Sequence, residues 1–255
     1  MKTSNILMTT AVIIILGSLL LYDFGLRDEY QKINKIGVQE YQKTNRFNGY
    51  EKADITDFNA INFKAANNII AKVEYGEKEA VWINKNAKGM VDVSQEGKKL
   101  IIDLSAKGKE RNYSGYQASV IIISPEVKQI DAEAFGKVRK YKGKYGDSIV
   151  TTYQNNRCYI SGFRYDSLLI NLAANTYLQL DDNQLKALNA TVGDKAGNGT
   201  LVINSDNNID KVNLDVRGKS TVEVLDLDIK NIKYKISDGA VVTFRGTALS
   251  KLNKE

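Results

Sequence analysis

The sequence predicts an all-β protein that contains a parallel β-helix, or β-solenoid, with coils of about 20 residues, preceded by a single N-terminal transmembrane helix. Three observations carry this prediction. Short alternating apolar runs replace helical periodicity after about residue 56, the alternating pattern recurs at a fixed period, and the N-terminus holds a long uncharged stretch. With 255 residues, 43% hydrophobic and 26% charged, the chain has the composition of a globular protein, so wholesale disorder is excluded.

Residues 1–22 are predicted to form a membrane anchor. No charged residue lies between Ile6 and Tyr22, while Lys2 precedes this stretch and Asp23 follows it. As a helix the stretch covers roughly 25 Å, which one membrane span tolerates. A cleaved signal peptide is the alternative, but no pair of small residues suited to cleavage follows the apolar run. Lys2 favours a cytoplasmic N-terminus, so we expect the bulk of the chain to be extracytoplasmic.

Residues 23–56 are predicted to form a charged stalk or linker. This segment is rich in charged residues, Asn and Gln, and it ends near the Asn48-Gly49 turn signal. Leu26, Tyr30 and Ile33 have near-helical spacing, so a helical interaction surface is the alternative to a solvated segment.

Residues 57–255 are predicted to form the β-solenoid, and the C-terminal third of the chain carries its repeat. Each copy has four apolar positions at h-x-x-h-x-h-x-h, then a turn, then h-x-h. The copies begin at Tyr165, Leu185, Ile209 and Ile229. Corresponding residues are 20 positions apart in the first half of the first two copies and throughout the last two copies, and the second copy has extra residues in its loops. The opening half of the pattern also occurs at Val127, Ile130, Ala132 and Ala134, and a fifth copy is expected to begin at Leu249 and Leu252.

A single copy cannot bury its apolar face alone, so we expect successive copies to stack as parallel coils. In this register four side chains point inward (Ile170, Ala190, Leu214 and Tyr234), while Asn213, Asp215, Lys233 and Lys235 point outward. Three glycines, Gly193, Gly218 and Gly239, fall near a corner of the coil, where a positive φ is often needed. A meandering antiparallel sheet with accidental spacing is the alternative.

The chain resembles the "putative adhesin" head GIN domain family of bacterial envelope proteins of the Bacteroidetes type. The resemblance lies in Phe58–Gly76, Val91–Leu104, Ile123–Ala134 and the repeats, and it spans about residues 55–252. No single motif is diagnostic of the family, but the order of these segments along the chain is diagnostic. The resemblance implies a mostly β, solenoid-like fold and a place in the bacterial cell envelope, and it brings no catalytic residues.

The amino-acid composition excludes most common types of catalytic site. The chain has no His and one Cys, so neither a Ser-His-Asp nor a Cys-His site can form, and a His-ligated metal is excluded. We expect Cys158 to be a small buried apolar residue. Asp182 and Asp226 share one corner column, roughly 9–10 Å apart, but they lack a neighbouring acid, base or metal site. The segment Asn204–Asp210 lacks the ligand spacing of a calcium loop. We therefore predict no catalytic residue, no metal site and no cofactor.

Residues 135–164 form a basic insertion, rich in Tyr, that the family resemblance does not cover. Its seven basic residues face one acid, Asp147, and the excess of six equals the net charge of the chain. Basic groups bind phosphate, sulfate or uronate, and Tyr rings stack on sugars. The predicted ligand-binding residues are Lys137, Arg139, Lys140, Tyr141, Lys142, Lys144, Tyr145, Arg157 and Arg164. A solvated loop or protruding hairpin without a ligand is the alternative.

These observations predict a non-catalytic module for binding, adhesion or envelope scaffolding, held in the bacterial cell membrane by a single pass, with the bulk of the chain in the periplasm. Its expected partners are the membrane, through residues 6–22, and an anionic glycan, a lipid headgroup or another envelope protein. Nucleic acid is not expected in that compartment. The alternative function is that of a carbohydrate-active enzyme, a polysaccharide lyase or hydrolase on the same scaffold.

Overall fold

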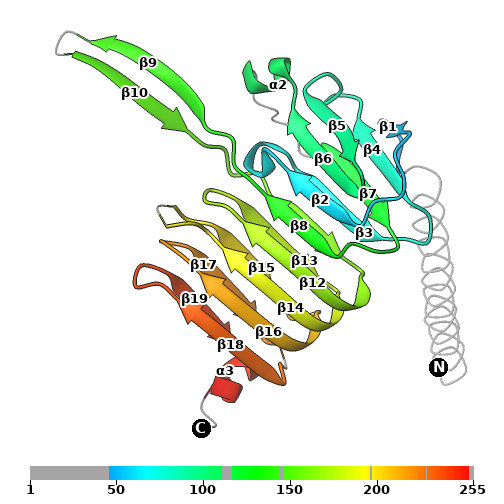
Figure 1. Ribbon diagram of the computed structural model, residues 1–255, viewed down its shortest axis with the longest axis vertical. Helices are drawn as coiled ribbons and strands as arrows, with labels where there is room; N and C mark the ends of the chain where they lie inside the picture. The colour runs from blue at the N-terminus through cyan, green and yellow to red at the C-terminus, as the bar shows by residue number, and fades with distance from the viewer. Residues whose placement is uncertain (1–45, 111–116, 144–145, 196, 228, 253–255) are drawn as a thin grey trace, which may run out of the picture. The chain divides into compact units, whose positions relative to one another are not determined.

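A computed structural model describes residues 46–110, 117–143, 146–195, 197–227 and 229–252. The chain divides into two compact units, Met1–Asn48 and Gly49–Glu255, and the strands that the structure describes lie in the second (Figure 1). No helix among the described residues is long and apolar enough to span a membrane. The predicted span Ile6–Tyr22 and most of the predicted stalk lie outside the described residues.

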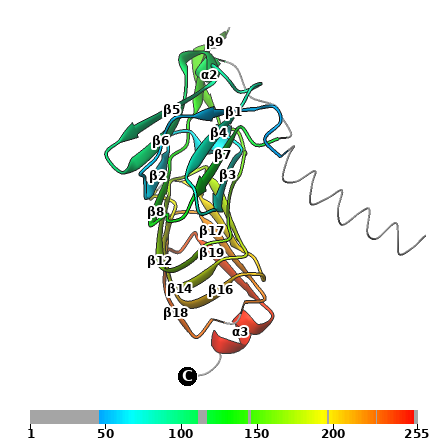
Figure 2. The same cartoon turned by 90° about the vertical axis from the view of Figure 1, so that its right-hand side faces the viewer.

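The second unit is all-β, as predicted, with two large open sheets that form facing layers (Figure 2). Sheet A contains, in spatial order, β1 (Tyr50–Ala53), β4 (Ala80–Asn84), β7 (Val120–Ser124), β3 (Ala71–Tyr75), β11 (Cys158–Ser161), β13 (Tyr177–Asp181), β15 (Thr200–Ile203), β17 (Thr221–Leu225) and β19 (Val241–Arg245). Sheet B contains β18 (Asn231–Ile236), β16 (Asn208–Val216), β14 (Gln184–Val192), β12 (Arg164–Leu172), β8 (Gln129–Ala132), β2 (Ala60–Phe63), β6 (Lys99–Leu104) and β5 (Val91–Glu96).

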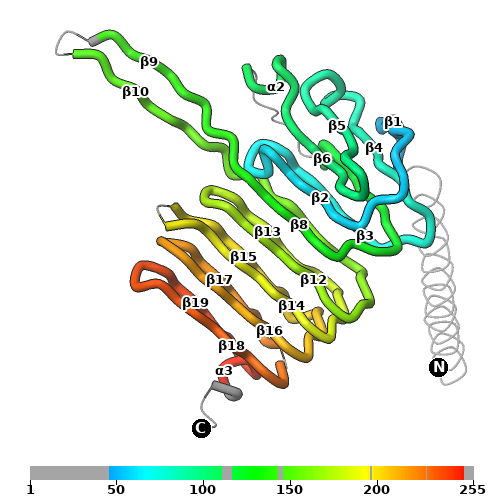
Figure 3. The backbone as a smooth tube through the Cα atoms, in the orientation of Figure 1, coloured from blue at the N-terminus to red at the C-terminus, as the bar shows by residue number. Residues whose placement is uncertain are grey.

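We call a strand of sheet B, together with the strand of sheet A that continues it, a rung; from β12 onward the chain alternates between the two sheets in this way. The pairs β12–β13, β14–β15, β16–β17 and β18–β19 are successive rungs, and Figure 3 shows how the backbone advances from one to the next. Strands of neighbouring rungs pair in parallel, in the register that the sequence repeat predicts. Ile170 pairs with Ala190, Ala190 with Leu214, and Leu214 with Tyr234.

The core lies between the two sheets and is built from alternate residues of each strand. Ile170, Ala190 and Leu214 are at most 4% exposed, as expected for inward-facing positions. Asn213 and Asp215 are half-buried, and Lys233 is exposed. The expected burial of Tyr234 is wrong, because its side chain is 55% exposed. The reason is its position on β18, the edge strand of sheet B, which has no further strand on its outer side.

Asparagine side chains fill one corner between the sheets. Asn183 is wholly buried, and its Oδ1 accepts a hydrogen bond of 3.1 Å from the backbone N–H of Phe163. Its Nδ2 donates to the carbonyl of Ile160 at 3.1 Å and to Oδ1 of Asn207 at 2.9 Å. These bonds satisfy backbone groups that would otherwise be buried without a partner.

The opposite corner requires glycine at one position. Gly193 has φ +81°, and a Cβ there would lie 1.8 Å from Oγ of Ser220, so only glycine fits. The expected positive φ is confirmed at Gly193 and Gly218. It is wrong at Gly239, which is absent from the positive-φ residues of the described chain.

The N-terminal part of the second unit departs from uniform parallel stacking. β2–β3 lie between β6–β7 and β8–β11 in both sheets, although β6–β7 come later in the chain than β2–β3. β4 pairs antiparallel with β1 and β7, and β5 pairs antiparallel with β6. The reason for the last pairing is the two-residue turn Gly97–Lys98, which can join only antiparallel strands.

The expected fifth copy is also wrong, because the residues after β19 form a short helix, α3 (Thr247–Leu252). Oδ1 of Asp226 accepts a hydrogen bond of 3.0 Å from the backbone N–H of Thr247, the first residue of that helix. Ala248 is wholly buried, so the helix covers part of the last rung.

Candidate functional site

The basic insertion forms a two-stranded hairpin, which consists of β9 (Lys137–Gly143) and β10 (Gly146–Thr152). Five of the predicted ligand-binding residues lie on β9: Lys137, Arg139, Lys140, Tyr141 and Lys142. Lys144 and Tyr145 lie at the turn, outside the described residues. Among the described strands, β9 and β10 pair only with each other, and Figure 1 shows them extending away from the stacked rungs.

The hairpin replaces a short turn. The strands β8 and β11 belong to one rung, and residues 133–157 connect them. In the next rung, residues 173–176 make the same connection between β12 and β13. The insertion therefore leaves the stacking of the sheets undisturbed. Within the predicted range 135–164, Cys158–Ser161 is a strand of sheet A, and Arg164 opens β12 of sheet B.

Both faces of the hairpin carry basic and apolar side chains. Arg139 is opposite Val150 and Tyr141 is opposite Ser148, so these four share one face. Lys140 is opposite Ile149 on the other face, with Lys142 opposite Asp147. Every residue of β10 is exposed, and Ile149 and Val138 are 67% and 57% exposed. An isolated two-stranded hairpin is marginally stable in water, and this one leaves large apolar side chains uncovered.

The positive charge of the hairpin is not neutralised within the described residues. Lys137 donates a hydrogen bond from Nζ to the carbonyl of Glu110. Arg139, Lys140 and Lys142 form no ion pair with any residue that the structure describes. Three cationic groups therefore stand on a thin exposed ribbon, where an anionic surface can approach them from either face.

Arg157 and Arg164 lie outside the two hairpin strands, and each has another partner. The guanidinium of Arg157 lies 4.4 Å above the ring centre of Tyr177, at the start of β13. Arg164 forms an ion pair of 2.9 Å with Oδ1 of Asp182. The sequence grouped these two residues with the hairpin by proximity along the chain, but the fold does not bring them together with it.

Asp182 and Asp226, the two aspartates considered for the enzymatic alternative, stabilise turns. Both Asp182 and Asp226 have positive φ, +49° and +45°, a conformation that Asp tolerates at corners. Oδ1 of Asp182 is bound by Arg164, and Oδ1 of Asp226 accepts hydrogen bonds from the backbone and hydroxyl of Thr247. Neither carboxylate has the paired acid and base geometry of a glycosidase.

The thiol of the chain is inert. Cys158 is wholly buried on β11, and burial raises its pKa to about 12. A thiol in such a setting is protonated at neutral pH and is a poor nucleophile and metal ligand. Within the described ranges, no group of three or more Cys, Asp or Glu residues could hold a metal ion.

Sequence reasoning did not identify one further feature, an open groove of about 380 Å³ on the outer face of sheet B. It crosses β12, β14, β16 and β18 and is lined mainly by outward-facing residues of the repeat. The signal was present in the sequence, since the polar residues between the apolar positions recur with the same period.

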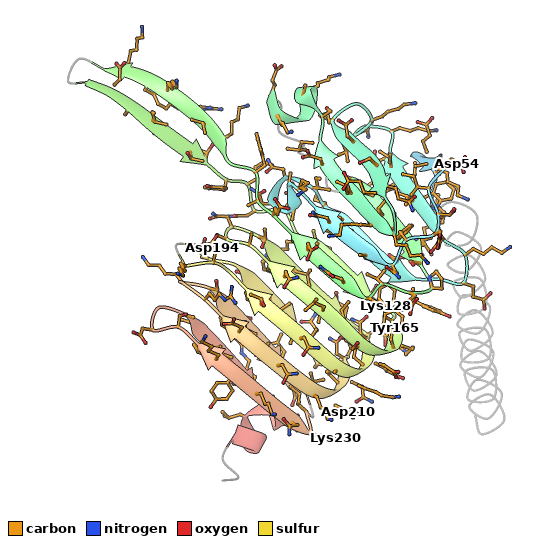
Figure 4. All side chains as sticks on the ribbon, in the orientation of Figure 1. Asp54, Lys128, Tyr165, Asp194, Asp210 and Lys230 are labelled. Atoms are coloured by element: carbon orange, nitrogen blue, oxygen red, sulfur yellow. The ribbon has the colours of Figure 1, made fainter. Side chains whose placement is uncertain are left out.

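Charged side chains also meet between rungs on this side of the protein, as Figure 4 shows for Asp210 on β16 and Lys230, which directly precedes β18. Their ion pair measures 2.6 Å.

No family model matches the chain, and no curated protein matches it. The chain is similar in structure to a protein named "putative adhesin" from Parabacteroides distasonis ATCC 8503, with 16% identity, a TM-score of 0.55, and coverage of 77% of this chain and 73% of that one. A second "putative adhesin", from Bacteroides fragilis NCTC 9343, has 14% identity, a TM-score of 0.45, and coverage of 77% and 93%. A "putative lipid binding protein" from Parabacteroides distasonis ATCC 8503 has 14% identity, a TM-score of 0.39, and coverage of 77% and 94%.

At these identities the similarity concerns the fold, and of these three neighbours only the first has a TM-score that supports even that argument. The similarity to the first neighbour therefore shows the fold alone. Membership in the head GIN domain family has no support from a family model.

Proposed function

We propose that this chain is a non-catalytic binding module of the bacterial envelope. In this proposal the rungs form a parallel β-solenoid, residues 6–22 tether it to the cell membrane, and the β9–β10 hairpin is its contact surface. The ligand is an anionic group, either the phosphate of a lipid headgroup or the carboxylate or sulfate of a glycan. Both sources present the same chemistry to Lys and Arg.

The observation that carries the proposal is the exposure of cationic and apolar side chains together on a hairpin that no other described strand covers. Arg139, Lys140 and Lys142 supply charge without a described counter-ion, while Val138 and Ile149 supply apolar area. A charged, partly apolar ribbon gains both electrostatic attraction and apolar burial when it meets an anionic surface.

The test is the triple variant Lys140→Glu, Lys142→Glu, Lys144→Glu of the full-length protein, held in phosphatidylcholine nanodiscs. Its binding to phosphatidylglycerol vesicles and to dextran sulfate is measured at low salt. The matched control is Lys195→Glu, Lys211→Glu, Lys219→Glu, which makes the same change in net charge at residues outside the hairpin.

We expect the hairpin variant to lose at least tenfold in affinity and the control to lose much less. A loss toward vesicles alone assigns the ligand to lipid headgroups, and a loss toward dextran sulfate alone assigns it to glycans. Equal losses in the two variants would show that net charge, and not the hairpin, determines binding. Binding of the hairpin variant at the parental affinity would also overturn the proposal.

A further inference from the structure

The groove on the outer face of sheet B is bordered by two rows of side chains that run in the direction in which the strands stack. The first row consists of Leu169, Asn189, Asn213 and Lys233, and the second contains Thr191, Asp215 and Lys235. Between the rows, Ala190, Leu214 and Tyr234 also line the groove. Because neighbouring strands are about 4.8 Å apart, equivalent side chains recur along the groove at that spacing.

The amides of the first row are linked to each other and keep unused hydrogen-bonding capacity. Nδ2 of Asn213 donates a hydrogen bond of 2.7 Å to Oδ1 of Asn189. In the described part of the chain, no hydrogen bond uses Oδ1 of Asn213 or Nδ2 of Asn189. Both side chains are half-buried, so these two groups are fixed in position at the groove and open to a ligand.

The charges of the groove change along its length. Asp215 accepts a hydrogen bond of 2.9 Å from Nε of Arg217, and this bond lowers the pKa of the carboxyl group although burial acts in the opposite direction. Asp215 is therefore neutralised by a fixed partner. Lys233 and Lys235 are exposed and form no ion pair with any described residue, so the end of the groove on β18 is positive. The end on β12 is uncharged, with Leu169 37% exposed.

We propose that this groove binds one strand of an acidic linear polysaccharide, which lies along the stack of rungs. The hydroxyl groups of successive sugars meet Asn189, Thr191 and Asn213, and a carboxylate meets Lys233 and Lys235. A sugar ring in an extended chain has nearly the length of one rung step, so β14, β16 and β18 each present a pair of side chains to one sugar. The face of a ring packs on Leu169. This site is separate from the hairpin and does not depend on its function.

The experiment measures the affinity of the full-length protein for polygalacturonate, with uncharged dextran as the comparison polymer. Both are tested in a background with Arg139→Ser, Lys140→Ser and Lys142→Ser, so that hairpin charge does not contribute. One groove variant is Asn189→Val with Asn213→Val, which removes both partners of the amide pair together and should preserve stability. Its matched control is Thr200→Val with Thr221→Val, a register pair on sheet A. A second groove variant is Lys233→Gln with Lys235→Gln.

We expect each groove variant to bind polygalacturonate about tenfold or more weakly than the background protein, and the sheet A control to bind as the background does. Binding of polygalacturonate at the background affinity by both groove variants would overturn the proposal. The absence of any binding to polygalacturonate would also overturn it. If the groove variants instead abolish self-association, seen by light scattering, the groove is an interface between copies and the proposal is wrong.

Discussion

Asn183 and Asn207 are joined side chain to side chain across neighbouring rungs, with Nδ2 of Asn183 donating to Oδ1 of Asn207 at 2.9 Å. The same Oδ1 accepts the backbone N–H of Asn183 at 3.0 Å, and Nδ2 of Asn207 donates to the carbonyl of Leu180 at 2.8 Å. The two amides therefore satisfy the buried backbone at a corner where the chain leaves one sheet and enters the other. The next residue in this column is the apolar Leu227, which is 2% exposed, so the amide pairing ends there.

Replacement of Asn183 by Ala should lower the free energy of unfolding by about 2–4 kcal/mol, because several buried backbone groups, including the carbonyl of Ile160, lose their partner. Urea denaturation checks this value. The control is Asn208→Ala, an exposed residue at the start of β16, which should change stability by less than about 0.5 kcal/mol. A similar small effect for both substitutions would show that the asparagine pair does not stabilise the corner.

Leu214→Asp should destabilise the protein by about 3–5 kcal/mol, because it places an unpaired carboxylate in the core. Leu214 is 4% exposed and faces the interior from the middle of β16. Asp215→Asn, on the opposite face of the same strand, should cost less than about 1 kcal/mol because the ion pair with Arg217 is partly solvated. Thermal or urea unfolding of both variants checks the register, and equal shifts would contradict it.

Asp131 should contribute stability that depends on pH. Burial alone would raise its pKa, but hydrogen bonds from Asn171, Gln129 and Lys99 outweigh burial and lower it below the ordinary 3.8. Because the folded pKa is the lower one, this stabilisation is present above about pH 4 and is lost as the pH falls through the folded pKa. Asp131→Asn should cost about 1 kcal/mol at pH 7, since the site is partly exposed, and almost nothing near pH 2. The free energy of unfolding at both pH values is the measurement, and a cost that does not change with pH would contradict the assignment.

If residues 6–22 anchor the protein, we expect Ile6–Tyr22 to remain part of the mature chain and to hold the protein in the membrane. N-terminal sequencing of the mature protein should begin at or near Met1, and the protein should remain in the membrane after extraction with alkaline carbonate. A mature N-terminus beyond Tyr22 would contradict the tether and leave the proposal for the hairpin intact.

The strands and register of the C-terminal rungs could be predicted from sequence because each inward position is apolar at a fixed period. The pairing of Ile170 with Ala190 follows from the 20-residue period, and that of Ala190 with Leu214 follows once the extra residues of the second copy are placed in loops. The spatial order at the other end could not be predicted. β3, β7 and β11 are strands of four or five residues that each place apolar side chains in the core, and their local sequences do not determine which of them become neighbours.

The candidate site was predictable in composition and only in part in geometry. The charge excess marked the insertion, and a protruding hairpin was one of the two structures expected for it. Proximity along the chain could not separate Lys140 from Arg157, because a strand boundary at Cys158 returns the chain to sheet A. The corner asparagines were also missed as a pair, since Asn183 and Asn207 become neighbours only through the parallel register.

The central claim, that the hairpin is the contact surface of a binding module, is tested most directly by a hairpin-shortened protein. In this variant a four-residue turn with the sequence of residues 173–176 replaces the chain between β8 and β11. Its affinity for phosphatidylglycerol vesicles and dextran sulfate is measured against that of the parent as salt rises through about 0.15 M, where the Debye length is about 8 Å. We predict that the shortened protein keeps the unfolding cooperativity of the parent and, at low salt, binds the ligand of the hairpin, whether phosphatidylglycerol vesicles or dextran sulfate, at least tenfold more weakly than the parent does. The parent should bind at low salt and lose affinity steeply as salt rises. A shortened protein that folds and binds as the parent does would contradict the claim.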